Sequence, residues 1–387
     1  MKLFIKVFFI FAVVASLLSQ LPSVLESGMD SYLKLSWIPI FTVLIIYNPK
    51  TFFEKPLCPY YIFLFVFFMY CIILQLLTTK EYVGTDFNNM CISCMITTVS
   101  YSFYKCNGNG KTLKLLSLFI LLAASILAFF VFRDFLFGYD FGSLLYAFAS
   151  KNSMGSILLS SVVIGVLFIA NNKTKITNIS LIALSTFILV VMIMMKSRAT
   201  LAGFFFVILY LVTKFKNNKI RILFSVLTVC CILLVLIDST IYNIVVNNLL
   251  FANRGTELDS LEDLNSISSN RVERFPVLYK AFEDSMFFGI GNKYFDCFPF
   301  IIMVQYGIVG AIIVFTFIYK IFRFIQFKLN RTNLLYLITF FLFWIFMINC
   351  LFEAQPPFGP GVKCFLLWMM FGFSLAQYKQ SGKAVTK

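Results

Sequence analysis

The sequence lacks histidine altogether and has few charged residues. Asp, Glu, Lys and Arg make up 13% of the 387 residues, whereas 60% are hydrophobic and 50 are Phe. A chain so poor in charge has too little polar surface for a soluble globular protein. The absence of histidine removes the commonest ligand of zinc and haem sites. The composition therefore predicts an integral membrane protein, and we expect it to use no metal and no other cofactor.

The cysteines give no sign of a disulfide framework. They lie at positions 58, 71, 91, 94, 106, 230, 231, 297, 350 and 364, nearly all within or beside apolar runs. The one suggestive spacing, Cys91 and Cys94, has no second pair to complete a metal site. We interpret the cysteines as packing residues of membrane helices.

Long polar stretches are also scarce, because apolar runs fill most of the chain. A membrane-spanning helix needs about 20 mainly apolar residues. Twelve runs approach this requirement, although the fourth is half polar and the eighth is short. They cover residues 3–19, 33–47, 60–78, 87–104, 115–132, 153–170, 179–195, 200–212, 222–237, 297–318, 333–352 and 362–378. The predicted fold is an all-α membrane protein with about 12 transmembrane helices.

Acidic residues are nearly missing from one set of connecting segments. If both termini face the cytoplasm, the cytoplasmic segments contain 20 of the 32 Lys and Arg residues but only Glu54 among the 17 acids. Cytoplasmic loops of membrane proteins are rich in Lys and Arg. The pattern therefore predicts a multi-pass protein with both termini in the cytoplasm. The net charge of +15 reflects this orientation and does not indicate a nucleic-acid partner.

One long polar stretch sets the expected organisation of the chain. Residues 1–237 are expected to form transmembrane helices 1–9, and residues 238–296 one large extracytoplasmic (periplasmic) loop. Residues 297–387 are expected to form transmembrane helices 10–12 and a short cytoplasmic tail. Within the loop, the apolar pattern predicts an interfacial helix at 241–251 and an amphipathic helix at 272–288.

Two cations interrupt the apolar stretch MMKSRATLAGFFF, which begins at residue 194. Lys196 and Arg198 fall in the expected outer turn between two helices, where both side chains could simply reach lipid headgroups. Alternatively, Ser197 or Thr200 caps the next helix, so that free N–H groups and a fixed guanidinium form an anion site. Arg198 is the stronger candidate of the two cations, because its planar fork can bind a phosphate bidentately.

Four segments occur in an informative order between about residue 140 and residue 320. They are FASKNSMGSILL at 148–159, KSRATLAGFF at 196–205, NRVERFPVLYKAFEDSMFFGIGNKYF at 270–295 and QYGIVGAIIVF at 305–315. In this order, and around one large outer loop, they resemble the bacterial O-antigen polymerase and O-antigen ligase superfamily. The resemblance implies a polytopic glycosyltransferase of the type C architecture in the bacterial cytoplasmic (inner) membrane.

The resemblance also implies the substrate and the partners. Such enzymes use a glycan carried on a polyprenyl pyrophosphate and act on the outer face of the membrane. The expected partners are therefore polyprenyl-pyrophosphate-linked oligosaccharide and membrane lipids, with a chain-length regulator protein as a further candidate. No nucleic acid is expected.

The chemistry of such a reaction requires fixed cations. Breaking the bond between a sugar and a pyrophosphate leaves negative charge on the leaving group, which preorganised cations stabilise as it develops. Arg198 and Arg271 are the candidates for this catalytic role, and they would make a metal unnecessary. Arg274 is a candidate substrate-binding residue. The alternative for the two loop arginines is a solvated helix face, with local pairing to Glu273 and Glu283.

A base for the acceptor hydroxyl is harder to identify. Ligases of the superfamily place a histidine in the large loop eleven residues before a glycine, and this chain has Asp296 at that spacing from Gly307. A carboxylate there could orient or deprotonate a sugar hydroxyl. It could equally be an acidic helix cap. The departure from histidine favours a polymerase over a ligase.

Three further polar residues are candidates for substrate binding. Glu353, in FEAQPPFGPG, is a lone carboxylate at the outer end of a predicted helix, where it is either functional or merely interfacial. Asn152 could bind a sugar or cap its helix. Lys196 could contribute charge beside Arg198.

Together these features predict a polymerase that joins lipid-linked oligosaccharide repeats of O-antigen or a related surface glycan. The closest alternative is a ligase that transfers a finished glycan to a lipid or protein acceptor. An alternative of another class is a transporter or flippase of lipid-linked glycans, although the chain lacks the internal repeats that are typical of many transporters.

Overall fold

The computed structural model describes most of the chain. The described residues are 2–78, 80–108, 110–138, 151–170, 175–195, 197–214, 271–329, 333–354, 356–359 and 363–385, with positions 222 and 229. Throughout this part the secondary structure is helical, without strands. The prediction of an all-α protein is thus confirmed for the residues that the structure describes.

The helices follow the predicted apolar runs closely. They are α1 (Lys2–Leu18), α2 (Pro22–Glu26), α3 (Asp30–Lys34), α4 (Trp37–Tyr47), the 3-10 helix η1 (Pro49–Thr51), α5 (Cys58–Leu77), α6 (Thr85–Asn107), α7 (Gly110–Leu136), α8 (Lys151–Ala170), α9 (Lys175–Met194), α10 (Arg198–Lys214), α14 (Arg271–Glu283), α15 (Phe298–Lys328), α16 (Leu334–Asn349) and α17 (Phe365–Val385). The run at 33–47 is broken by a turn that separates α3 from α4.

Two predicted elements outside this correspondence need separate mention. The predicted span at 222–237, apart from positions 222 and 229, and the predicted interfacial helix at 241–251 lie outside the described residues. The predicted helix at 272–288 is confirmed as α14, which ends at Glu283 and is followed by turns.

Within the described part, α5, α7 and α15 are long and apolar enough to cross a membrane, and several other helices are apolar but shorter. The number of crossings, about 12, stays a prediction, as does the division at residues 237 and 296.

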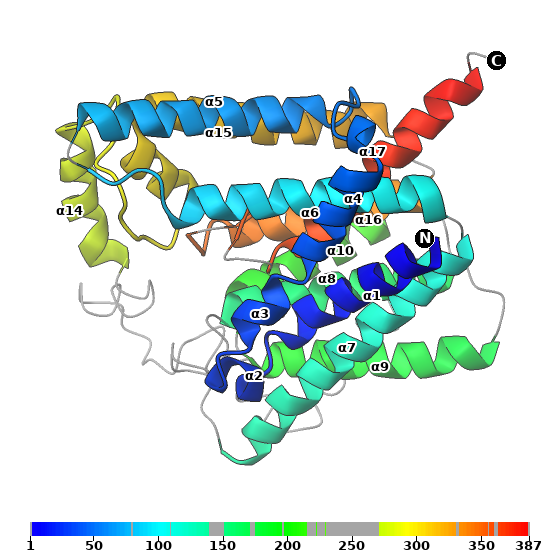
Figure 1. Cartoon of the computed structure of the whole chain (residues 1–387). Helices are drawn as coiled ribbons and strands as arrows, with labels where there is room; N and C mark the ends of the chain where they lie inside the picture. The colour runs from blue at the N-terminus through cyan, green and yellow to red at the C-terminus, as the bar shows by residue number, and fades with distance from the viewer. Residues whose placement is uncertain are drawn as a thin grey trace.

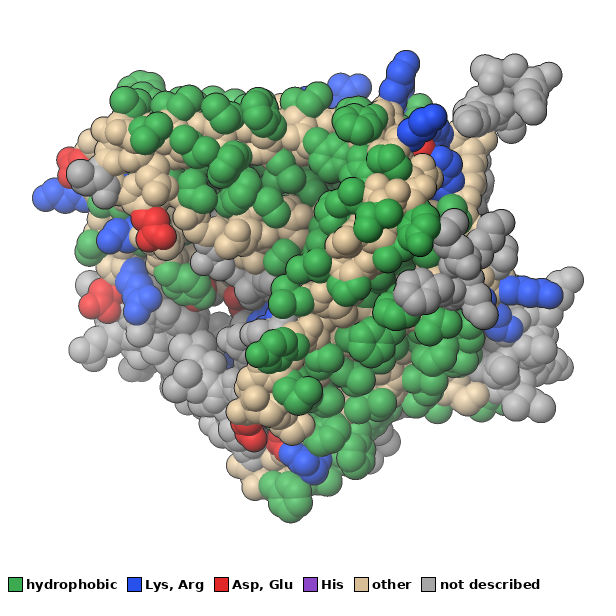
Figure 2. Space-filling view, viewed as in Figure 1, with side chains coloured by type: hydrophobic (Ala, Val, Ile, Leu, Met, Phe, Trp, Pro, Cys, Tyr) green, Lys and Arg blue, Asp and Glu red, His purple; other side chains and the backbone are tan. Residues whose placement is uncertain are grey.

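Apolar side chains cover the outside of the helical bundle as well as its core. On α5, Phe63 and Phe67 are buried against the core, whereas Phe65 is 64% exposed and Leu76 is 81% exposed. Hydrophobic side chains likewise cover most of the face seen in Figure 2, over α5, α1 and α7. Helices satisfy their backbone hydrogen bonds internally, so a surface of this kind suits a lipid environment. The composition and the structure therefore agree on a multi-pass membrane protein.

Close helix packing depends on small residues at the contact. A Cβ atom on Gly372 of α17 would lie 2.5 Å from the carbonyl oxygen of Thr97 and 2.9 Å from the Cβ of Ser100, both on α6. Only glycine allows the two backbones to approach this closely, which is a common device between membrane helices. This contact fixes α17 against α6 along much of its length.

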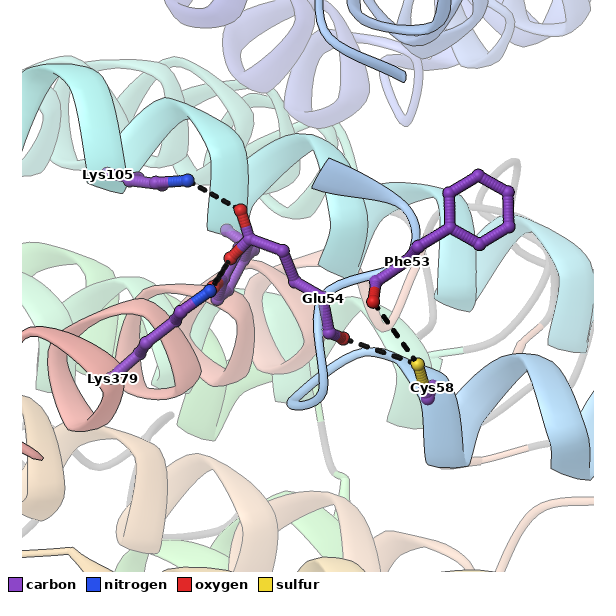
Figure 3. Close-up of polar contacts among 6 residues, drawn as sticks. Phe53, Glu54, Cys58, Lys105 and Lys379 are labelled. Atoms are coloured by element: carbon purple, nitrogen blue, oxygen red, sulfur yellow. Dashed lines mark hydrogen bonds and ion pairs between the residues drawn. The ribbon is translucent and has the colours of Figure 1, made fainter. Parts of the chain in front are cut away.

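A polar cluster joins the same two helices to the start of α5 at one end of the bundle. The carboxylate of Glu54 accepts hydrogen bonds from Lys105, at 2.5 Å, and from Lys379 (Figure 3). It also accepts one from the hydroxyl of Tyr101. Burial raises the pKa of Glu54, but the hydrogen bonds from its three partners lower it by more. The net result is a pKa lowered from 4.5 to about 2. Glu54 therefore stays ionised at neutral pH and ties α5, α6 and α17 together.

The bundle has two distinct ends (Figure 1). The C-terminal end of α17 lies at one end, and α14 lies at the other. Between them, α5 and α15 run side by side, with the rings of Phe63 and Phe317 stacked at 3.8 Å. The hydroxyl of Tyr70 also donates to the carbonyl of Tyr306 at 2.6 Å. This pairing anchors the start of α15 near α14.

Candidate active site

Asn152, in the first turn of α8, connects three separate parts of the chain. Its Nδ2 donates to Oε1 of Glu353 at 2.9 Å, and its Oδ1 accepts from the hydroxyl of Ser197 at 2.8 Å. Glu353 follows α16, and Ser197 directly precedes α10. The two roles predicted for Asn152, sugar binding or capping of its helix, stay predictions. The structure adds that its side chain hydrogen-bonds to two other candidate segments.

Ser197 in turn organises the start of α10. Its Oγ lies 2.7 Å from Oγ1 of Thr200 and accepts a long hydrogen bond, 3.4 Å, from the Thr200 backbone N–H. This is the pattern of a helix cap, so the predicted cap is confirmed and Ser197 provides it. Both side chains are fully buried. Gly155 of α8 makes room for them, because a Cβ there would lie 2.2 Å from Oγ1 of Thr200.

The predicted cations are placed only in part. Arg198 is the first residue of α10 and Arg271 the first residue of α14, but their side chains are not among those described. Lys196 lies outside the described residues. Arg274 is exposed on α14. The structure thus fixes the backbone positions of Arg198 and Arg271 at two helix N-termini, where the helix dipole favours a bound anion.

The turn that carries Glu353 also meets the start of α15. The backbone N–H of Phe298 donates to the carbonyl oxygens of Cys350, at 2.8 Å, and of Glu353, at 3.0 Å. Asp296 is only two residues before Phe298, so it lies in the immediate neighbourhood of the Glu353 turn. Asp296 is half-buried and accepts a hydrogen bond from the hydroxyl of Tyr294 at 2.6 Å. The backbone segments that carry the two candidate carboxylates therefore lie next to each other.

The glycine motifs contact one another where the predicted outer loop joins α15. Gly307 has non-helical backbone angles, φ 66° and ψ −177°, within α15, and a Cβ there would lie 2.2 Å from the carbonyl oxygen of Phe287. A Cβ on Gly289 would in turn lie 2.3 Å from the carbonyl oxygen of Gln305. Both positions require glycine, because the two backbones cross in direct contact. We call this contact, between Gly289 and Gly307, the glycine crossing.

Backbone hydrogen bonds hold the glycine crossing together. Ile290 N donates to the carbonyl of Val304 at 2.9 Å, and Gly291 N donates to that of Gln305 at 3.1 Å. The segment after α14 is thereby tied to the first turns of α15. This arrangement gives a structural reason for the Gly-x-Gly motif and for the glycine that follows the large loop.

Apolar packing places α14 over the same region. The rings of Phe275 and Phe300 are 4.7 Å apart, and Leu278 and Phe282 pack on a small core that includes Ala354, the residue after Glu353. The helix that begins at Arg271 therefore covers the start of α15 and the Glu353 turn. Sequence patterns predicted helix α14 but not its packing against the start of α15 and the Glu353 turn.

Lys363 was missed by the sequence argument. It lies just before α17, is only 6% exposed, and its Nζ has no hydrogen-bond partner in the described part of the protein. Its electrostatic partners include the carboxylate of Glu353. The available signal was a lone cation at the start of the predicted span at 362–378, ten residues after Glu353. A cation in that position is ordinarily interpreted as a marker of the membrane boundary.

The described arrangement hydrogen-bonds Asn152 to both Glu353 and Ser197. The backbone of the Glu353 turn contacts Phe298, two residues after Asp296. Glu353 also acts electrostatically on Lys363. Helix N-termini such as that of α10 favour bound anions, and carboxylates interact readily with hydroxyl groups. Over the described residues there is no group of three or more Cys, Asp and Glu side chains with the geometry of a metal site.

A comparison with protein families gives an independent result. Residues 183–307 match the family model described as O-Antigen ligase, which covers less than half of the chain but includes Arg198, Arg271 and Asp296. The match supports the O-antigen ligase and polymerase superfamily and confirms the resemblance seen in the sequence. Proteins of that family are glycosyltransferase-like enzymes of glycan assembly. A search of curated proteins gives no match to this chain.

Proposed function

We propose that this chain, whose central part matches the O-antigen ligase family, is a polymerase of O-antigen or a related surface glycan. It joins oligosaccharide repeats that are carried on polyprenyl pyrophosphate, on the outer face of the bacterial cytoplasmic membrane. The observation that carries the proposal is the hydrogen-bonded chain from Glu353 through Asn152 to Ser197, which fixes the start of α10 where Arg198 lies.

The donor reacts by losing a pyrophosphate. The guanidinium of Arg198, with that of Arg271 from α14, stabilises the charge that develops on the leaving phosphate as the sugar–oxygen bond breaks. Such stabilisation is most effective when the charges are held in place before the reaction begins. The buried cap at Ser197 and the packing of α14 on α15 support this role, because both limit backbone movement at these arginines. The proposed chemistry needs no metal.

The acceptor sugar contributes a hydroxyl group. Asp296 orients this hydroxyl and accepts its proton as the new glycosidic bond forms, a role for which carboxylates are well suited. The hydrogen bond from Tyr294 fixes one of its oxygens, and the nearby Glu353 turn adds a second carboxylate to the region. Arg274, Lys196 and Glu353 are the proposed contacts to the rest of the glycan.

A ligase is the second candidate, because the matching family model is described as a ligase. In that case the same site would transfer a finished glycan from the lipid carrier to a lipid or protein acceptor. The absence of histidine in the chain favours the polymerase.

The test is turnover of the purified protein in proteoliposomes with purified lipid-linked repeat units as the only glycan. A polymerase converts them into lipid-linked chains of two or more repeats, and Asp296→Asn lowers the rate about 100-fold or more. Products that appear only after an acceptor lipid or protein is added identify a ligase. Movement of intact repeats across the bilayer without bond formation identifies a transporter and contradicts both enzymes.

A further inference from the structure

We propose that Lys363 is an additional binding residue of this site, whose ammonium group holds a phosphate of the polyprenyl pyrophosphate donor beside the Asn152–Glu353 hydrogen bond. This inference rests on the proposed function, since it concerns the same site, but it makes a separate claim about a residue that lies outside the family match at 183–307.

The first argument is the burial of Lys363 without a partner. Lysine is almost never fully buried in proteins unless it is paired. The residue is 6% exposed, and none of its three N–H groups has a hydrogen-bond partner among the described residues. Burial of an unsatisfied ammonium is costly for folding. We interpret this cost to folding as offset by ligand binding, because a bound anion would accept hydrogen bonds from all three N–H groups.

The second argument is the arrangement of charge around Lys363. The groups that act on it are Glu353, Lys34, Cys364 and Asp30. Asp30 already forms an ion pair with Lys34, and Glu353 already accepts from Asn152. Neither carboxylate hydrogen-bonds to Lys363. They act on the ammonium electrostatically without accepting a hydrogen bond from it. Its three N–H groups have no acceptor among the described residues, and we assign that role to the ligand.

The third argument is the rigidity of the backbone near Lys363. The Sγ of Cys364 donates to the carbonyl of Gly359 at 3.3 Å, and Trp368 Nε1 donates to that of Pro357 at 2.8 Å. Ser93 of α6 donates to the carbonyl of Phe358 at 3.2 Å. The turn at 356–359 and the start of α17 are thus attached to each other and to α6. Fixed supports of this kind are what a preorganised binding residue needs.

The class of ligand follows from the neighbourhood. Glu353, which acts on Lys363 only electrostatically, is hydrogen-bonded to Asn152, and Asn152 is hydrogen-bonded to Ser197 at the start of α10. The N-terminus of α10 is a favourable place for a phosphate. A pyrophosphate has two phosphate groups, so one can lie at α10 and the other at Lys363. A single hydroxyl or a neutral sugar would not balance the charge of the ammonium.

The experiment compares four forms of the full-length protein in detergent: wild type, Lys363→Met, Lys363→Arg and Lys320→Met. Farnesyl pyrophosphate, a short polyprenyl pyrophosphate, is the binding probe, and the melting temperature without ligand is recorded in parallel. Lys320→Met is the matched control, because it removes the same charge from an exposed lysine in the second half of α15.

We expect Lys363→Met to weaken farnesyl pyrophosphate binding by about tenfold or more, the loss that follows from one hydrogen-bonded charge. Its melting temperature without ligand should be equal to that of the wild type or higher, because methionine has a similar shape and no buried charge. Lys363→Arg should recover binding at least in part. Since arginine stays protonated, this recovery also excludes a role of Lys363 as a base. Lys320→Met should bind like the wild type.

Two results would overturn the inference. One is wild-type affinity in Lys363→Met. The other is weaker binding together with a lower melting temperature and no recovery in Lys363→Arg, which would identify a structural lysine. The proposed function fails separately: wild-type protein that binds the probe through Lys363 but never extends lipid-linked repeats contradicts the polymerase alone. Extension of repeats with an unchanged KM for the lipid-linked donor in Lys363→Met contradicts only the inference.

Discussion

At the scale of residues, the main finding is that two candidate site residues from distant parts of the sequence are hydrogen-bonded to each other. Asn152 and Glu353 are 201 positions apart in the sequence, yet their side chains are hydrogen-bonded. Each could be selected from the sequence alone, because a lone carboxylate or amide at the end of an apolar run is unusual. Their pairing could not be predicted, because it depends on how α8 packs against α16. Lys363 could not be predicted as a site residue for a related reason, because its burial arises only in the folded chain.

Glu353 provides the first prediction. Glu353→Ala removes the acceptor of the Asn152 amide, so Asn152 and the cap at Ser197 lose their fixed position. Misplacement of about 1 Å at an active site can cost about 100-fold in rate, and we expect a loss of that order in kcat for the extension of lipid-linked repeats. Glu353→Gln should lose less, because its amide oxygen can still accept from Asn152.

The control for this prediction is Leu351→Ala, an exposed residue in the same turn. It should retain the wild-type rate. Full activity in Glu353→Ala would show that the hydrogen-bonded chain does not support the reaction.

At the scale of elements, hydropathy predicted the helices better than it predicted their irregularities. The apolar runs correspond to helices across the described part of the chain, because membrane helices carry a strong and local signal. The non-helical backbone at Gly307 carries no such signal, since the residues around it remain apolar. The position of α14 over α15 is likewise set by contacts between distant segments, which a single sequence does not encode in a readable way.

The glycine crossing gives the second prediction. In Gly307→Ala, the added methyl group meets the carbonyl of Phe287, and alanine must adopt a backbone conformation that is almost restricted to glycine. We expect a loss of stability of about 1–3 kcal/mol from the strain. Thermal unfolding in detergent measures it, together with easier proteolysis after α14.

Gly110→Ala serves as the comparison, because the space around that glycine is open. It should melt within error of the wild type. An equal melting temperature for Gly307→Ala would mean that the two backbones can separate without cost.

The cluster around Glu54 gives the third prediction, which concerns pH. Because the folded-state pKa of Glu54 is lowered to about 2 from 4.5, its contribution to stability is present above about pH 4.5. That contribution is lost as the pH falls from 4.5 towards 2. At pH 7, Glu54→Gln should therefore be less stable by about 1 kcal/mol, a value that allows for solvent screening.

Melting temperatures measured from pH 7 down to pH 3 test the sign. The difference between wild type and Glu54→Gln should shrink as the pH falls below 4.5. Glu26→Gln, at an exposed position on α2, should show no comparable trend. A difference that stays constant or grows at acid pH would contradict the assigned role of the carboxylate.

At the scale of the whole molecule, charge predicts orientation and the structure adds the geometry. The C-terminal end of α17 lies at one end of the bundle, and α14 lies at the other (Figure 1). Glu54 lies with the former, because it pairs with Lys379 of α17. The predicted cytoplasmic tail and the predicted outer loop therefore occupy opposite ends. The Glu353 turn packs close to α14, because Ala354 belongs to the same small core as Leu278 and Phe282. If the predicted orientation holds, the Asn152 site lies on the outer side; the orientation itself stays a prediction.

Cysteine labelling in intact cells is the fourth prediction. Cys106 is exposed at the end of α6 that is expected in the cytoplasm. With the other cysteines replaced, it should react with a membrane-impermeant maleimide only after the membrane is permeabilised. Lys293→Cys, introduced in the same background lacking Cys106, should react in intact cells. The reverse pattern would invert the proposed topology.

The central claim is that the chain joins lipid-linked repeats through the site at the start of α10. The most direct measurement restores a strain lacking this gene with either the native protein or Arg198→Ala at matched membrane levels, and resolves the surface glycan by chain length on a gel. We predict a ladder with the native protein and only single repeats with Arg198→Ala. A full ladder with Arg198→Ala would contradict the site, and a full ladder in the strain lacking the gene would contradict the polymerase itself.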